Sequence, residues 1–113
     1  MNTSAGTLTL VTEYTGSNKG TLTYTFEDSG CYLLFLTTCY VGNTYRQISY
    51  DVSTERGSIE TDWVMGTDYT GNGWYAKSWA QIARFDITAG ETLILTPDYQ
   101  TGGDRSYKIY KVN

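Results

Sequence analysis

The chain has 113 residues, a formal net charge of −4 and no histidine. This length suits one domain, 1–113. The acidic balance argues against nucleic acid as a partner, because domains that bind phosphate backbones carry a basic stripe. The lack of histidine removes the usual base of nucleophilic catalysis.

The composition favours an ordered β-protein. Leu, Ile, Val and Phe together make up just under a fifth of the chain, but 11 Tyr and 3 Trp supply apolar area in their place. Thr is the most frequent residue and Ala is scarce, a balance that suits pleated strands and disfavours helices. We therefore expect a core and a surface that are both rich in Tyr.

Short runs of alternating polarity, separated by Gly, Asn and Asp, follow one another along the first half of the chain. In Thr21–Phe26, Leu22, Tyr24 and Phe26 share one face and three Thr share the other, which is the clearest strand signal. Glu27–Gly30 predicts a tight hairpin turn. Cys31–Tyr40 is apolar on both faces at its start, which predicts a central strand.

The second half of the chain contains a long glycine-rich stretch. Gly66–Gly73 has three Gly and is predicted to be a polar loop. Trp74–Ile87 is ambiguous, because residues 79–83 could form a helical turn whereas Ala83–Ile87 alternates like a strand. A short strand that starts at Thr92 is predicted to stop before Pro97.

These patterns predict an all-β fold: an antiparallel β-sandwich, jelly-roll-like, with about eight strands at the spacing typical of such folds. The predicted strands are Thr7–Tyr14, Thr21–Phe26, Cys31–Tyr40, Arg46–Val52, Ser58–Met65, Ala83–Ile87, Thr92–Thr96 and Ser106–Val112.

The two cysteines are not expected to pair with each other. Cys31 and Cys39 lie in one predicted strand, so their separation of roughly 26 Å far exceeds the ~7 Å limit for a disulfide. Their spacing puts both on one face, where we expect small buried apolar residues; an intermolecular link and a reactive role are the alternatives. Two thiols without His fall short of a zinc site.

Two segments resemble a known family. Tyr24–Leu34 and Phe85–Leu95 are similar to the hairpin and the apolar-x-Leu-x-x-Gly-Asp segment of trimeric jelly rolls of the complement C1q and tumour-necrosis-factor type, with Ile87 and Glu91 in the Leu and Asp places. Similar hairpins occur in small domains of bacteriophage tails, fibres and capsid decorations. The resemblance implies a jelly roll and a homotrimer.

Candidate binding residues gather in the aromatic segment 63–79. The site residues predicted here for a ligand or an interface are Trp63, Asp68, Tyr69, Asn72, Trp74 and Tyr75. Aromatic rings stack on sugars and anchor protein interfaces, and Asp or Asn can bond sugar hydroxyls. The alternative is that Trp63 and Trp79 belong to the core and that the Gly and Asn only turn the chain.

Catalytic and metal sites have weaker support. Asp68, Asn72 and the loop Asp98–Asp104 offer oxygen ligands but no EF-hand spacing, so we expect neither metal nor cofactor. Glu60 and Asp62 share a face of one predicted strand, as a glycosidase pair would, but a chain this small seldom builds a catalytic cleft and an outward polar face explains them without further assumption.

We therefore expect a non-enzymatic structural or interaction protein, namely a bacteriophage virion component such as a capsid decoration or a tail or fibre protein. Its partners would be copies of itself and other virion proteins. The sequence has no run long enough to insert into a membrane and no signal peptide, which predicts synthesis in the host cytoplasm and a place in the virion. The alternative is a carbohydrate-binding, lectin-like module that binds a host-surface glycan through segment 63–79.

Overall fold

A computed structural model describes residues 6–17, 20–42, 49–97 and 104–113. These described residues form nine β-strands and no helix. The strands are β1 (Leu8–Gly16), β2 (Leu22–Thr25), β3 (Gly30–Gly42), β4 (Tyr50–Thr54), β5 (Gly57–Ile59), β6 (Asp62–Gly71), β7 (Trp74–Ile87), β8 (Thr92–Pro97) and β9 (Asp104–Val112).

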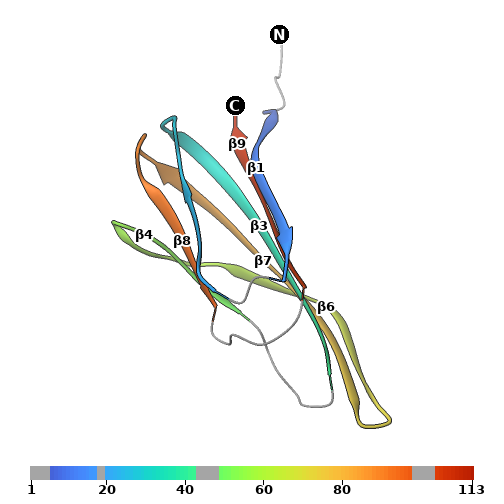
Figure 1. The fold of residues 1–113 in the computed structure, drawn as a ribbon. Coiled ribbons are helices and arrows are strands. Elements are labelled where there is room, and N and C mark those ends of the chain that lie inside the picture. Colours follow the sequence, from blue (N-terminus) through green and yellow to red (C-terminus); the bar gives the residue numbers. More distant parts are fainter. Residues whose placement is uncertain (1–5, 18–19, 43–48, 98–103) are drawn as a thin grey trace.

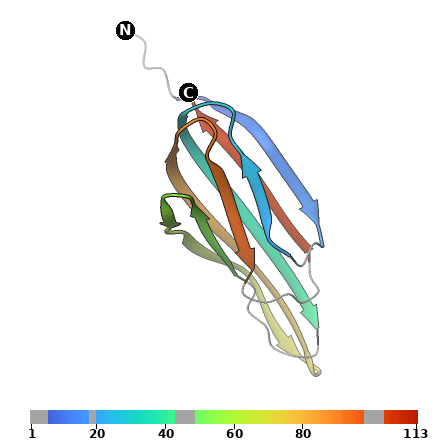
Figure 2. The ribbon, with the colours of Figure 1, turned by 60° about the vertical axis from the view of Figure 1, so that its left-hand side comes forward.

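The strands form two antiparallel sheets that lie face to face, as Figures 1 and 2 show. The five-stranded sheet has the order β1-β9-β3-β7-β6, and the four-stranded sheet has the order β2-β8-β4-β5. Most neighbouring strands are distant in sequence, as in a jelly roll wound from Greek keys. The predicted fold class is therefore confirmed, and β3 is the central strand of its sheet, as its two apolar faces indicated.

The structure has one strand more than predicted because the run Ser58–Met65 is divided. β5 ends at Ile59 and pairs with β4, whereas β6 begins at Asp62 and pairs with β7. The chain thus passes from one sheet to the other at residues 60–61. The helical turn considered for residues 79–83 is wrong, because β7 is continuous from Trp74 to Ile87.

The predicted hairpin at Glu27–Gly30 is also wrong. The chain does turn there, but β2 pairs with β8 in one sheet and β3 pairs with β7 and β9 in the other. The segment therefore connects the two sheets. Turn chemistry is local and does not specify which strands pair.

The main core lies between the sheets and combines aliphatic with aromatic side chains. Phe26, Leu34 and Ile109 are each at most 1% exposed. Phe26 contacts three rings, with centroid distances of 4.9 Å to Tyr24, 4.5 Å to Tyr32 and 6.1 Å to Phe85. The predicted inward face of Thr21–Phe26 is thus confirmed.

The two cysteines face away from this core. Cys31 and Cys39 lie in β3 and are both free, with Cys31 half-buried and Cys39 exposed. The expectation that they are buried is wrong, because the inward positions of β3 belong to the alternate residues, from Tyr32 to Tyr40. No helix in the described part of the chain is long and apolar enough to span a membrane.

Candidate functional site

The predicted loop Gly66–Gly73 is instead part of a long β-hairpin. β6 and β7 pair up to Gly71 and Trp74, and only Asn72 and Gly73 turn the chain. Their φ angles of 52° and 76° are both positive, as a two-residue type I′ turn requires. Figures 1 and 2 show this hairpin projecting at the end opposite the chain termini.

The hairpin does not bring the predicted site residues into one cluster. Paired residues in antiparallel strands point to the same side of a sheet. Tyr69 and Trp74 lie on the side turned away from the four-stranded sheet, which we call the outer face. Trp63, Asp68 and Tyr75 lie on the opposite side, and Asn72 lies in the turn.

Trp63 and Trp79 share that opposite side but differ in burial. Trp79 is 3% exposed and packs with Tyr40 in a small second core, which confirms the alternative that placed Trp79 in the core. Trp63 is 43% exposed, so the alternative that placed it in the core is wrong.

The outer face is unusually apolar for a surface. The described residues include nine exposed large hydrophobic side chains, and seven of them lie on this face. They are Leu8, Leu10, Phe35, Val41, Val64, Tyr69 and Trp74. They are spread along the whole face, from Leu8 in β1 to Trp74 beside the β6–β7 turn. Large exposed apolar surfaces on proteins mark interaction sites.

Two shallow hollows indent the outer face. One, of about 320 Å³, is lined by Leu8, Phe35, Lys108 and Tyr110, and the rings of Phe35 and Tyr110 meet edge to face at 5.7 Å. The other, of about 310 Å³, includes Thr37, Val64 and Ala80 among its lining residues. Hollows of this depth can accept side chains from a second surface.

On the other side of the hairpin, sequence reasoning missed an ion pair between a buried lysine and an exposed aspartate. Lys77 is 7% exposed, its Nζ donates to Asp68 Oδ1, and it lies 5.9 Å from the centroid of the Tyr75 ring. Lys77 thus holds one carboxylate oxygen of Asp68, while the Asp68 side chain is 55% exposed, and its role in ligand binding stays a prediction. The alternation of Tyr75, Lys77 and Trp79 could have indicated a buried lysine, because it places Lys77 on the same side of the strand as the two aromatic residues.

A groove of about 400 Å³ opens where the chain crosses between the sheets. Trp63 forms one wall, and Asp51, Ser53 and Ser58 are among its polar lining residues. Gln81, which is 3% exposed, also lines it. We call this the Trp63 groove; of its lining residues, the sequence had singled out only Trp63 as a site residue.

Gln81 is fixed by backbone contacts. Its Oε1 accepts from Tyr50 N at 2.9 Å, and its Nε2 donates to Tyr50 O at 2.9 Å and to Thr61 Oγ1 at 3.0 Å. The pairing of β5 with β4 begins at Val52, so Tyr50 has no partner residue in β5. The side-chain amide of Gln81 supplies the hydrogen bonds to Tyr50 that a neighbouring strand would otherwise make. The Trp63 groove therefore has a rigid base.

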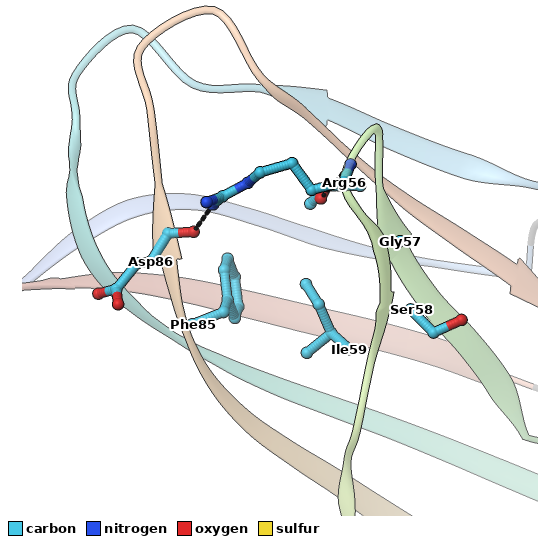
Figure 3. A pocket seen from close by; sticks show the side chains of 7 residues that line it. Arg56, Gly57, Ser58, Ile59, Phe85 and Asp86 are labelled. Carbon is cyan, nitrogen blue, oxygen red and sulfur yellow. Dashed lines mark hydrogen bonds between the residues drawn. The ribbon is translucent and has the colours of Figure 1, made fainter.

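A further pocket of about 290 Å³ lies under the β4–β5 turn. In Figure 3, Arg56 extends from this turn toward Asp86, above Phe85 and Ile59. Its guanidinium donates to the Asp86 carbonyl, and Arg56 Nε donates to Glu91 Oε2 at 2.9 Å. The Glu91 carboxylate already balances the charge of Arg56. Arg56 therefore connects the two sheets rather than offering a site for an anion.

Glu91, the partner of Arg56, also forms a hydrogen bond within the β7–β8 turn. Its Oε1 accepts from Thr88 N at 2.5 Å, and this bond, followed by Arg56, lowers the pKa of the Glu91 carboxyl. A depressed pKa adds stability that is complete above the unfolded value of about 4.3 and is lost as the pH falls through the folded value.

We expect Glu91→Gln to remove this acid-sensitive contribution to stability. The free energy of unfolding, measured in urea from pH 7 down to pH 3, should fall less steeply below about pH 5 in the variant than in the wild type. Glu60→Gln, which replaces an exposed carboxylate, is the control and should follow the wild-type curve. Equal pH dependence in Glu91→Gln and the wild type would contradict this role.

The weaker catalytic and metal hypotheses gain no support from the geometry. Glu60 lies between β5 and β6 while Asp62 begins β6, so they do not share one strand as predicted. Among the described residues, no three His, Cys, Asp or Glu side chains gather as a metal site. Most of the loop Asp98–Asp104 lies outside the described residues.

Comparisons with known proteins do not add a family to this picture. No protein-family model, curated protein or solved structure matches the chain.

Proposed function

We propose that this chain is a non-enzymatic structural protein that assembles with copies of itself through the outer face. The observation that carries this proposal is the concentration of seven exposed large hydrophobic residues on one face of one sheet. Burying such a face removes apolar area from water, which is the main driving force of association.

Charge is sparse around the middle of the outer face. Phe35, Thr37, Ala80 and Val64 are uncharged, Lys108 lies directly opposite Phe35, and Glu13 lies opposite Lys108 on β1. The centre of a protein interface is depleted in charged residues, and Lys108 departs from this pattern. The two hollows offer places for side chains of a second copy.

For the assembly we propose a homotrimer, and for its setting a bacteriophage virion. The trimer and the virion rest on the sequence resemblance of Tyr24–Leu34 and Phe85–Leu95 to trimeric jelly rolls and phage domains, although Tyr24–Leu34 connects the two sheets here and is not a hairpin. Jelly rolls are a common architecture of capsid domains. The role is mechanical: the outer face of each copy packs against the neighbouring copies of the trimer, and other virion proteins bind the surfaces that remain.

Light scattering of the purified chain tests the assembly. At tens of micromolar we expect a mass near 38 kDa, which is three times the 12.7 kDa of one chain. Val64→Asp places a charge on the outer face and should lower the mass to that of one chain. Thr23→Asp changes an exposed residue of the four-stranded sheet and should leave the mass unchanged. A monomeric wild type would overturn the proposal.

The thiol of Cys39 gives a second measurement that needs no disruptive variant. Cys39 is exposed in the single chain and lies on the outer face. In a Cys31→Ser background, alkylation of Cys39 should slow as the protein concentration rises, because assembly covers it. A rate that does not depend on concentration would count against an interface here.

A further inference from the structure

We infer that the Trp63 groove is a binding site for a neutral carbohydrate, with a sugar ring stacked on Trp63. This site goes beyond the assembly function and does not depend on it. It also differs from a single site in the aromatic segment, because Trp63 and Trp74 lie on opposite sides of the sheet.

The first argument is the shape and rigidity of the groove. Its volume of about 400 Å³ lies at the lower end of ligand pockets, a size for one or two sugar rings. β4 and β5 belong to one sheet and Trp63 to the other, so the groove spans the crossing of the chain. The three hydrogen bonds of Gln81 fix its base without a ligand, which lowers the cost of binding.

The second argument is the combination of one exposed ring with several small polar groups. Trp63 offers an indole that is 43% exposed, and sugars present a C–H face to such rings. The Asp51 carboxylate can accept hydrogen bonds from sugar hydroxyls, and the Ser53 and Ser58 hydroxyls can donate or accept them. A few polar groups around an apolar surface are the usual means of orienting a small ligand.

The third argument concerns charge. The described residues that line the groove include the carboxylate of Asp51 and no Lys or Arg. Phosphate and other anions would therefore lack a counter-charge and would face Asp51 directly. A neutral ligand rich in hydroxyls satisfies the same groups without this repulsion.

The test uses nuclear magnetic resonance of the ¹⁵N-labelled protein with cellobiose, maltose, lactose and diacetylchitobiose, each at up to about 20 mM, a range that detects millimolar affinities. We expect at least one sugar to shift the indole N–H signal of Trp63 and the side-chain amide signals of Gln81 in a saturable way. Failure of all four sugars to shift these signals would overturn the inference.

Matched variants place the site. Trp63→Ala should weaken binding at least about tenfold, and Asp51→Asn should weaken it several-fold. Trp74→Ala alters an exposed tryptophan on the outer face and should leave the affinity unchanged. Loss of binding in Trp74→Ala with retention in Trp63→Ala would overturn the assignment.

The same titration in Val64→Asp separates this inference from the proposed assembly. Binding of the sugar by a monomeric variant is the expected result, because the groove is built within one chain. A variant that is monomeric, folded and unable to bind would show that the groove is incomplete without a second copy, and would overturn the inference as stated.

Discussion

Phe26→Ala is expected to lower the free energy of unfolding by about 3–5 kcal/mol, the usual cost of removing a buried phenyl ring. Phe26 is 1% exposed and contacts the rings of Tyr24, Tyr32 and Phe85, so its loss leaves a cavity that three rigid neighbours cannot fill. The cost is a large share of the 5–15 kcal/mol by which most domains are stable. Urea unfolding followed by tryptophan fluorescence measures it, and the melting temperature should fall by about 15 °C.

The position of Phe26 in the chain adds to this effect. Its N–H donates to the Glu91 carbonyl at 2.9 Å, and its carbonyl accepts from Gly90 N at 2.8 Å. The residue therefore anchors the connection between β2 and β3 to the β7–β8 turn. Phe26→Leu keeps the backbone bonds and much of the apolar volume, and should cost only about 1.5 kcal/mol. Equal losses in the two variants would contradict the ring-packing explanation.

The strands around Phe26 were predictable from sequence because their signal is local. Leu22, Tyr24 and Phe26 alternate with Thr, and the period of two places them on one face whichever strands pair. The same pattern does not say which strands pair. For this reason the sequence did not predict that the chain passes from one sheet to the other at Glu27–Gly30 and at residues 60–61. At residues 60–61 the alternation even continues while the chain changes sheet.

The hairpin was missed because its glycines indicated a loop. A Cβ at Gly66 would lie 2.5 Å from Ser78 Oγ, so this glycine leaves room for a side chain of the neighbouring strand and does not turn the chain. Only Asn72-Gly73 turns, and Asn-Gly between runs of Tyr, Thr and Trp is the signal for a two-residue hairpin.

The separation of the aromatic residues could not be predicted from alternation alone. In an unbroken strand, Trp63 and Tyr69 would lie on the same face. The register of β6 shifts between Met65 and Asp68, and this bulge moves Tyr69 to the face of Val64. One inserted residue thus divides the predicted site into an apolar outer face and a polar groove, and so into the two proposed functions.

Gln81→Leu is expected to cost about 2–4 kcal/mol, because it leaves the buried N–H and carbonyl of Tyr50 without partners while keeping a side chain of similar size. Urea unfolding measures the loss. Hydrogen exchange adds a local readout, since the Tyr50 amide should lose protection that the core amides of β3 retain. Thr61→Val removes only the third bond of Gln81 and should cost less than about 1.5 kcal/mol, with the Tyr50 amide still protected. Full protection of that amide in Gln81→Leu would show that the Gln81 side chain does not replace a neighbouring strand.

Because Gln81 also forms the base of the Trp63 groove, its loss should abolish the sugar-induced shift of the Trp63 indole even in the protein that remains folded.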